Sequence, residues 1–270
     1  MQELEGKVAL VTGAGRLRGI GRAAALALAN LGADVVVTGT GRDPATFPDD
    51  EQAIGWRDVE STAEQVRELG RRASTQVFDV TDPHAVQSAV DAAVAEHGRL
   101  DILVNNAAVG RGRDRCPVEL LEPAVFQRVL DVKVTGTFLC TQAVLKQLYR
   151  QGHGGKIVNV SSIAGKRGSE HTLAYNAANF AIVGMTQSMA REFGPHGINV
   201  NCVCPGLVAT SRMDAVKPDD ARVTARGAEP VERWGTDEEV GNLIAWLCTN
   251  ASSWIQGQSI NQDGGRVMEH

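Results

Sequence analysis

The sequence contains no apolar run long enough to form a membrane-spanning helix. Neither sign of charge dominates, because 27 lysines and arginines are interspersed with 32 aspartates and glutamates, which gives a net charge of −5. Nucleic acid and anionic membranes are therefore not expected partners. The first residues, MQELEGKVALVTG, place acidic residues ahead of a short apolar run, unlike a secretion signal, and we expect a cytoplasmic protein.

Cysteine is also scarce, with five residues scattered along the chain. Four of them lie in apolar segments that are expected to form strands or helices, which is typical of buried thiols rather than of disulfides. Cys202 and Cys204 lie in one expected strand, where we expect their sulfur atoms to point to opposite faces and not to share a metal ion. The sequence therefore predicts no metal site.

Short apolar runs rich in β-branched residues alternate with segments of helical periodicity. With 43% hydrophobic and 22% charged residues, and without internal repeats, the composition indicates one globular α/β domain over residues 1–270. The alternation requires crossover helices and predicts a doubly wound, Rossmann-like parallel sheet with helices on both faces. The expected strands span residues 8–12, 35–38, 74–78, 102–105, 156–161, 199–203 and 259–261.

A glycine-rich turn follows the first expected strand, with glycines at Gly13, Gly15, Gly19 and Gly21. Glycines in such a turn let the backbone approach a pyrophosphate, and the N-terminus of the following helix, expected to begin at Ile20, points at it. A strand before the turn and a helix after it make this pattern specific. The sequence therefore predicts a dinucleotide-binding site.

The kind of dinucleotide depends on the end of the second strand, where a carboxylate would bind the ribose hydroxyls and repel a 2′-phosphate. The sequence has Arg42 shortly after this strand and Arg18 in the glycine-rich turn. Two guanidinium groups without an acid favour NADP(H), because their forked donors match a phosphate. Residues 40–56 form a longer connection than usual and are expected to be a surface loop beside the cofactor. If this loop brings Asp43 inward, NAD(H) becomes the alternative.

A serine and a tyrosine are expected to meet near this site. Ser162 follows the strand at 156–161, and Tyr175 lies at the start of a helix that helical spacing predicts over residues 173–193. Residue 179 lies one turn further along, on the same face as Tyr175. A hydroxyl at a strand end and a phenol on the next helix can converge on one substrate oxygen atom.

These residues, with TGAGRLRGIG at 12–21, NNAA at 105–108 and PGLVAT at 205–210, resemble the short-chain dehydrogenase/reductase superfamily. The resemblance implies seven strands in the order 3-2-1-4-5-6-7, an NAD(P) cofactor, a small-molecule substrate and a substrate lid within residues 208–234. It also implies a homotetramer or homodimer, in which helices from residues 120–150 and 173–194 pack across a twofold axis. The further cofactor contacts that it implies are Asp79, Val80, Asn105, Ala107, Pro205, Val208 and Thr210.

The resemblance also shows two departures from the superfamily pattern. Five residues separate Gly13 from Gly19, where the superfamily commonly has three. The superfamily uses a catalytic serine, tyrosine, lysine and asparagine, and the first two correspond to Ser162 and Tyr175. The other two are exchanged, because Asn179 occupies the lysine position and Lys133 the asparagine position.

The exchange matters because a cation beside the tyrosine favours its phenolate form. An ammonium about 4 Å from a phenolate is worth roughly 4 kcal/mol at an effective dielectric constant of about 20, which is more than an asparagine dipole supplies. Lys133 shares a helical stripe with apolar residues, and we expect it to reach Tyr175 from the neighbouring helix and to restore this field. The alternative is that Lys133 extends to solvent and that the scaffold has lost redox competence.

The sequence thus predicts an NADP(H)-dependent oxidoreductase that interconverts a secondary alcohol and a ketone, with NAD(H) as the alternative cofactor. One alternative function is a non-redox cyclase, epimerase or lyase that uses Ser162 and Tyr175 as acid–base groups. Another is a catalytically silent protein that binds the dinucleotide. Arg111, Arg113 and Arg115 follow the fourth strand and would suit an anionic substrate, but the expectation is an arginine-rich loop in solvent.

Overall fold

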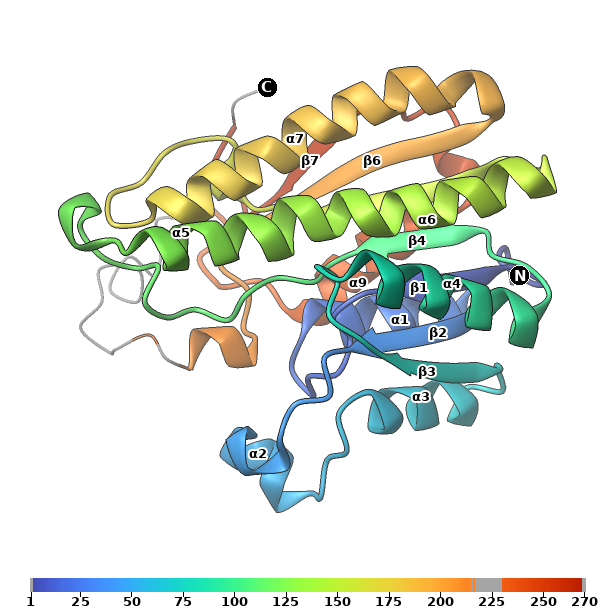
Figure 1. The fold of residues 1–270 in the computed structure, drawn as a ribbon, viewed down its shortest axis with the longest axis horizontal. Helices are drawn as coiled ribbons and strands as arrows, with labels where there is room; N and C mark the ends of the chain where they lie inside the picture. Colours follow the sequence, from blue (N-terminus) through green and yellow to red (C-terminus); the bar gives the residue numbers. More distant parts are fainter. Residues whose placement is uncertain (1, 215, 217–229, 269–270) are drawn as a thin grey trace.

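Seven parallel strands form the central sheet of the computed structural model, which describes residues 2–214, 216 and 230–268. The strands lie in the order β3-β2-β1-β4-β5-β6-β7 (Figure 1), as the resemblance implied. Each strand begins and ends within two residues of its predicted bounds. The strands are β1 (Val8–Val11), β2 (Asp34–Gly39), β3 (Ala73–Val77), β4 (Ile102–Asn105), β5 (Gly155–Val160), β6 (Ile198–Pro205) and β7 (Ser259–Gln262).

Helices cover both faces of the sheet (Figure 1). One face is covered by α1, α3 and α9, and the other by α4, α6 and the C-terminal part of α7. None of the described helices is long and apolar enough to span a membrane. The helices are α1 (Ile20–Asn30), α2 (Asp49–Ala53), α3 (Val59–Glu68), α4 (Pro83–His97), α5 (Pro123–Leu130), α6 (Gly136–Gln151), α7 (Leu173–Phe193) and α9 (Asp237–Leu247).

Side chains of a single strand contribute alternately to two cores. In β1, Ala9 and Val11 pack in the core that contains α1 and α9, whereas Val8 and Leu10 pack in the core that contains α4 and α6. All four residues are buried, because the strand has a helical layer on each side. This double burial explains why the strand is a continuous apolar run in the sequence.

Polar residues fix where the helices begin. Asp82 caps α4 by accepting hydrogen bonds from the backbone N–H groups of His84 and Ala85. Thr236 and Glu239 form a reciprocal capping box at the start of α9. Such caps satisfy N–H groups that have no partner within the helix.

The helix that carries Lys133 contains one widened turn. α5 leads directly into a π-helical turn, Asp131–Thr135, and α6 continues from Gly136. Single π-helical turns inside α-helices are frequent at functional sites. Lys133 lies in the middle of this turn, near the carboxyl ends of the central strands.

The connection after β2 is more ordered than the surface loop predicted for residues 40–56. It contains a short 3₁₀ helix, Pro44–Thr46, and then α2. Phe47 and Trp56 are buried, which explains why the segment folds back on the molecule although it is rich in turn-forming residues. In Figure 1, α2 lies at the lower edge of the molecule, beyond β2 and β3.

Most of the predicted lid, residues 208–234, lies outside the described residues. Its two ends are described and are joined to each other. Val208 pairs with Gly235 in an isolated β-bridge, and the backbone N–H of Gly235 donates to the carbonyl oxygen of Leu207 at 2.9 Å. This bridge fixes the base of the segment beside the end of β6.

Candidate active site

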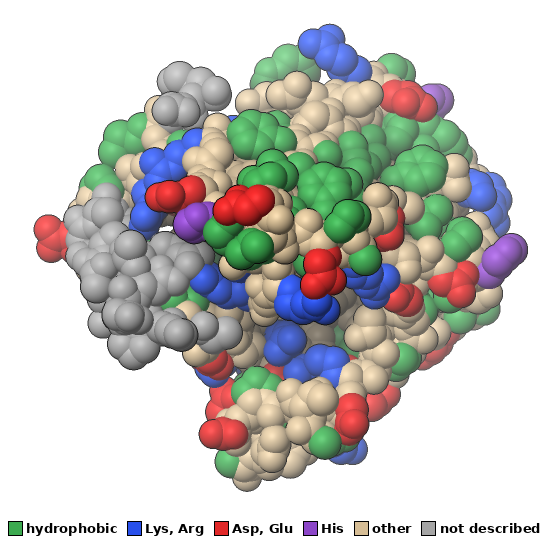
Figure 2. Space-filling model, turned by 60° about the vertical axis from the view of Figure 1, so that its left-hand side comes forward, with side chains coloured by type: hydrophobic (Ala, Val, Ile, Leu, Met, Phe, Trp, Pro, Cys, Tyr) green, Lys and Arg blue, Asp and Glu red, His purple; other side chains and the backbone are tan. Residues whose placement is uncertain are grey.

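The glycine-rich turn lines a cavity of about 510 Å³ at the carboxyl ends of the strands. Figure 2 shows Lys and Arg side chains gathered around a hollow on this face of the molecule. Gly13 adopts a φ of +67°, and a Cβ atom on Gly21 would lie 2.5 Å from the Gly13 carbonyl oxygen. The turn therefore has no room for side chains at these points and leaves the N-terminus of α1 accessible, as a bound pyrophosphate requires. The residues present fit a dinucleotide.

Residues 40–58 fold over this long turn and hold it in place. The backbone N–H of Leu17 donates to Glu51 Oε1 at 2.9 Å, and Trp56 Nε1 donates to the carbonyl oxygen of Gly15 at 2.6 Å. The Glu51 side chain is fully buried. The additional length of the turn is thus matched by the long connection after β2, because each segment supplies hydrogen-bond partners to the other.

Arg42, which the sequence analysis assigned to a 2′-phosphate, is bound by two carboxylates in the structure. Its Nη1 lies 2.8 Å from Glu51 Oε2, and its Nε donates to Asp58 Oδ1 at 2.9 Å. A third hydrogen bond runs from Nη2 to the carbonyl oxygen of Gly15. The guanidinium lines the cavity, but each of its three nitrogen atoms already binds a group of the protein.

Asp58 brings to the end of β2 the carboxylate that the strand itself lacks. A Cβ atom on Gly39, the last residue of β2, would lie 3.6 Å from Asp58 Oδ2, and one on Gly15 would lie 2.1 Å from Oδ1. The backbone of Asp58 adopts φ +53° and ψ −127°, a region that non-glycine residues rarely occupy. The sequence offers Asp43 for this role and gives no signal for Asp58, because the chain returns to the strand only after the α2 segment.

Arg18 is also paired with carboxylates. Its Nε lies 2.6 Å from Asp50 Oδ2, and its Nη2 lies 2.5 Å from Asp214 Oδ2. Hydrogen bonds to Asp214 and Asp50 raise the pKa of the Arg18 guanidinium above its ordinary value. Neither of the two arginines that favoured NADP(H) in the sequence is thus an unpaired cation.

Most of the other predicted cofactor residues line this cavity. The prediction for Asn105 is wrong, because its side chain does not reach the cavity. Asp79, Val80 and Ala107 line the wall, together with the glycines, Ile20 and Thr210. The side chain of Asn105 is instead buried and donates to Thr141 Oγ1 and Asn159 Oδ1, both at 3.0 Å. Its neighbour Asn106 lines the cavity and donates to the Gly13 carbonyl oxygen at 2.9 Å. The alternation of side chains at the end of β4 explains the difference.

Ser162 and Tyr175 line a second pocket, of about 240 Å³, and Tyr175 also lines the dinucleotide cavity. Pro205, Val208 and Thr210 contribute to the same pocket. The Ser162 hydroxyl is buried and donates to the Pro205 carbonyl oxygen at 3.4 Å. The tyrosine thus stands between the two spaces.

One asparagine holds the helix of Tyr175 against the segment that carries Ser162. Asn176 Nδ2 donates to the carbonyl oxygen of Ala164 at 2.7 Å and to that of Arg167 at 2.8 Å. These bonds fix the first turn of α7 to the loop that follows β5. They explain how Tyr175 on α7 and Ser162 after β5 keep a fixed position relative to each other.

Asn179 shares the cavity with Tyr175, as predicted, but its side chain is held by its own surroundings. Its Nδ2 donates to the Tyr175 carbonyl oxygen at 2.8 Å, and its Oδ1 accepts from Ser161 Oγ at 3.3 Å. The side chain is almost completely buried. The structure therefore places a neutral, engaged amide at the position where the superfamily pattern has a lysine.

Lys133 is buried, so the alternative in which it extends to solvent is wrong. Only 6% of the residue is exposed, and it lines the cavity together with Tyr175 and Asn179. Burial lowers the pKa of Lys133 to about 8, and the positive charge of Arg212 adds to this effect. Among the described residues, however, no hydrogen bond joins Lys133 to Tyr175.

The cations in contact with the Tyr175 ring are arginines. The guanidinium carbon of Arg115 lies 4.0 Å from the ring centroid and that of Arg212 lies 5.1 Å from it. The Arg115 side chain is only 13% exposed, which corrects the expectation of an arginine-rich loop in solvent. Arg113, at 74% exposure and paired with Glu122, matches that expectation. Sequence reasoning missed Arg212 and could not tell Arg115 from Arg113, because both belong to one irregular loop.

Cys202 and Cys204 lie on the same face of β6, with their sulfur atoms 4.0 Å apart. The expectation of opposite faces is wrong, because residues two apart in a strand point to the same side. All five cysteines are free thiols. Within the described part of the chain, no group of three or more His, Cys, Asp or Glu side chains is arranged to hold a metal ion.

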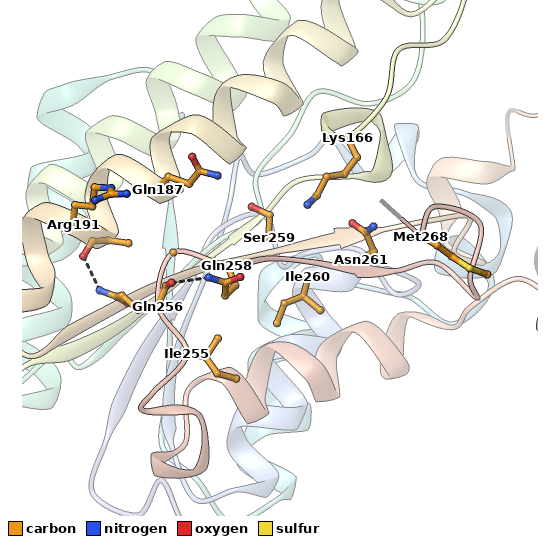
Figure 3. Close-up of a pocket in the computed structure, with 12 residues that line it drawn as sticks. Lys166, Gln187, Arg191, Ile255, Gln256, Gln258, Ser259, Ile260, Asn261 and Met268 are labelled. Atoms are coloured by element: carbon orange, nitrogen blue, oxygen red, sulfur yellow. Dashed lines mark hydrogen bonds between the residues drawn. The ribbon is translucent and has the colours of Figure 1, made fainter. Parts of the chain in front are cut away.

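A cavity of about 1080 Å³, larger than both of these spaces, lies elsewhere among the described residues, at the outer edge of the sheet along β7 and α7. Figure 3 shows Gln187 and Arg191 of α7 on one side of it and Ser259, Ile260 and Asn261 on the other. None of the predicted site residues lines it. Size alone therefore does not identify the functional site, whereas the glycine-rich turn and the serine–tyrosine pair do.

Comparison with known proteins agrees with this geometry. The family model described as enoyl-(acyl carrier protein) reductase matches residues 13–266. Short chain dehydrogenase/reductase astE of Aspergillus oryzae is 37% identical over 266 residues, which cover 97% of this chain and 95% of that protein. Cyclohexanol dehydrogenase of Rhodococcus sp. strain TK6 is 38% identical over 268 residues, covering 97% and 96%. The crystal structure of carveol dehydrogenase from Mycobacterium avium in complex with NAD superposes with a TM-score of 0.87 at 30% identity, covering 99% of each chain.

Proposed function

The chain belongs to the short-chain dehydrogenase/reductase superfamily and is an NAD(P)-dependent oxidoreductase, and from this premise we propose that it interconverts a secondary alcohol and a ketone. The observation that carries the proposal is the position of Tyr175, which lines both the dinucleotide cavity and the smaller pocket of Ser162. A substrate carbonyl group in that pocket would have its oxygen atom beside the phenol and its carbon atom facing the dinucleotide cavity. This is the arrangement that hydride transfer coupled to proton transfer requires.

In the proposed reaction the Tyr175 phenol and the Ser162 hydroxyl act on one substrate oxygen atom. The nicotinamide, when bound, accepts hydride from the alcohol carbon or delivers hydride to the ketone carbon. During reduction the Tyr175 hydroxyl gives its proton to the oxygen, and during oxidation the phenolate takes the proton back. Ser162 donates a hydrogen bond to the same oxygen and orients it, and buried Lys133 contributes positive charge to the cavity wall.

For the cofactor, the pairing of the arginines supports NAD(H) over NADP(H). Asp58 lies beside Gly39 at the end of β2, where a carboxylate binds ribose hydroxyls and repels a 2′-phosphate. Arg42 and Arg18, the basis for the NADP(H) prediction, are each bound by two carboxylates. We therefore place NAD(H) first and keep NADP(H) as the alternative that measurement must test.

We further propose a cytoplasmic homotetramer or homodimer. Exposed apolar side chains on α6 and α7, namely Phe138, Tyr149, Leu173 and Phe180, support an interface between copies of the chain. In Figure 2, hydrophobic side chains gather on the upper part of the face shown. Free thiols support a reducing compartment.

Replacement of Tyr175 tests the reaction, and the chain offers a matched control because it contains only two tyrosines. We expect the purified protein to reduce members of a panel of cyclic and acyclic ketones with NADH, as measured by loss of the absorbance of the reduced cofactor. Tyr175→Phe should lower kcat roughly 10²- to 10⁴-fold, the usual effect of removing an acid–base group. Tyr149→Phe, at an exposed position on α6, should leave kcat within about twofold.

Two results would count against the proposal. Equal kcat values for Tyr175→Phe and the unaltered protein would remove the phenol from the proton transfer. Cofactor binding without oxidation or reduction of any ketone or alcohol would favour the non-redox alternatives.

A further inference from the structure

The pocket of Ser162 and Tyr175 is strongly basic. Five arginines line it: Arg111, Arg115, Arg167, Arg212 and Arg266. Among the described residues, no aspartate or glutamate lines the same pocket. A concave surface with charges of one sign concentrates ligands of the opposite sign.

Arg115 is fixed at the inner end of this cluster. Its guanidinium stacks on the Tyr175 ring, and its Nε is buried without a hydrogen-bond partner, although Asp114 Oδ2 lies 3.2 Å away. Burial lowers the pKa of Arg115, and the charges of Arg212 and Arg111 add to the lowering while Asp114 opposes it. Asp114 is the described carboxylate that pairs with Arg115, while the positive charges of Arg212 and Arg111 lie close to the same guanidinium.

Arg212 approaches the same tyrosine from another element. It follows β6, donates from Nη1 to the carbonyl oxygen of Val109, and lies 5.1 Å from the Tyr175 centroid. No described carboxylate forms an ion pair with Arg212. Two guanidinium groups from separate segments therefore contact the ring whose hydroxyl is proposed to act on the substrate.

Resting on the proposed function, we propose that the substrate is a small carboxylic acid whose carboxylate is bound by Arg115 and Arg212 while its alcohol or ketone group lies at Ser162 and Tyr175. Arginine matches a carboxylate because its planar fork of N–H groups donates hydrogen bonds to both oxygen atoms at once. The volume of about 240 Å³ lies below the roughly 300–1,000 Å³ of pockets that take drug-sized ligands, which limits the acid to a small one. The carboxylate would supply negative charge where the guanidinium groups of Arg115 and Arg212 converge on the Tyr175 ring.

The test compares a keto acid with its neutral ester. With NADH, kcat/KM would be measured for 4-oxocyclohexanecarboxylate and for methyl 4-oxocyclohexanecarboxylate, with the unaltered protein and with Arg115→Gln, Arg212→Gln and Arg113→Gln. Arg113 is the matched control, because it belongs to the same loop as Arg115 but is exposed and paired with Glu122. Arg212→Gln provides an independent variant if Arg115→Gln does not fold.

We expect the unaltered protein to prefer the acid to the ester by at least about tenfold in kcat/KM. Arg115→Gln and Arg212→Gln should each raise KM for the acid roughly ten- to hundredfold, the usual effect of losing a hydrogen bond between charged groups, and change KM for the ester about twofold or less. Arg113→Gln should change neither. The proposal is overturned if the ester and the acid are used equally well, or if Arg115→Gln lowers kcat for both to the same extent.

A binding measurement separates this inference from the proposed reaction. Calorimetric titration of cyclohexanecarboxylate into the protein with saturating NAD⁺ should detect binding that Arg115→Gln weakens at least about tenfold. Binding of the acid without turnover of either ketone would support the carboxylate site and reject the proposed reaction. Turnover of the ester without any binding of cyclohexanecarboxylate would do the reverse.

Discussion

Lys133 is a buried lysine, and its burial lowers the free energy of unfolding of the protein. A lysine ammonium taken out of water loses hydration that only a counter-ion or hydrogen bonds can replace. Burial therefore lowers the pKa of Lys133 to about 8, with Cys202 opposing the shift and Arg212 adding to it. Keeping a basic side chain there lowers the stability of the protein without cofactor, which indicates a role in the site rather than in folding.

The sign of this effect gives a prediction for stability. The unfolded lysine titrates near 10.5 and the folded one near 8, so the unfolded state binds more protons between these pH values and stability rises with pH there. The buried ammonium therefore destabilises the protein at pH 7, by about 3 kcal/mol at most. Urea unfolding should show Lys133→Met to be more stable than the unaltered protein at pH 7, by an amount that shrinks toward pH 10.

The comparison of the two proteins at each pH removes the contribution of all other titrating groups. Two outcomes would contradict the desolvation of the ammonium that the structure indicates. Lys133→Met could be less stable than the unaltered protein at pH 7, or its gain in stability could be the same at every pH. Ketone reduction by the same variant would then report separately on catalysis. Activity within about twofold of the unaltered protein would remove Lys133 from the mechanism.

Single side chains also mark the limit of what the sequence could predict at this scale. The burial of Lys133 followed from its place on an apolar helical stripe, and the opposite environments of Arg113 and Arg115 did not follow from anything local. Asn105 and Asn106 are chemically identical neighbours, and which of them lines the cavity depends on how the end of β4 is oriented within the sheet. A residue's contacts across the fold, rather than its type, determine these outcomes.

Among the elements, the strands were the easiest to predict and the connection after β2 the hardest. Buried parallel strands are continuous apolar runs bounded by turn residues, so their bounds follow from local sequence. Residues 40–58 instead gain their structure from the glycine-rich turn, through hydrogen bonds of Glu51 and Trp56 and through the close approach of Asp58 to Gly15. These three residues are distant from that turn in the sequence. Local propensity carries no information about such pairing.

The carboxylate of Asp58, which lies beside the end of β2, predicts a preference for NAD(H) over NADP(H). Asp58→Asn keeps the shape of the side chain and tolerates a positive φ, but it removes the negative charge from the end of β2. We expect the ratio of kcat/KM with NADPH to that with NADH to rise at least about tenfold, because repulsion of the 2′-phosphate is lost and Arg42 keeps only one carboxylate partner. Initial rates with both cofactors measure this ratio.

Asp49→Asn is the control, because Asp49 is an exposed acid of the same connection, at the start of α2. It should leave the ratio unchanged. A strong preference for NADPH in the unaltered protein would refute the role given to Asp58 and restore the interpretation based on Arg18 and Arg42.

At the scale of the whole molecule, the strand order could be predicted because several spaced motifs resemble one superfamily, and the structure has that order. The number of copies in the assembly has no comparable signal in the chain. What the structure adds is a set of apolar side chains on α6 and α7 that remain exposed in one copy, with Phe138 and Phe180 each at 46% exposure. Exposed aromatic residues on adjoining helices are typical of an interface.

A charge placed on that surface tests the assembly. Phe180→Glu should convert the protein from a dimer or tetramer to a smaller species at micromolar concentration, because an unpaired carboxylate in an apolar interface costs several kcal/mol. Light scattering coupled to size-exclusion chromatography measures the mass. Ile54→Glu, which changes another exposed apolar residue far from these helices, should leave the mass unchanged. A monomeric unaltered protein would reject the proposed interface.

The contact between Gly15 and Asp58 has a consequence for how the protein can vary. The space that a methyl group on residue 15 would fill is occupied by a carboxylate oxygen 2.1 Å from that position. An alanine at 15 therefore demands a shorter or displaced residue at 58, and an acid at 58 demands glycine at 15. Among related sequences with the same long connection, residues 15 and 58 should therefore change together. Their covariation would couple nucleotide preference to the shape of the phosphate-binding turn.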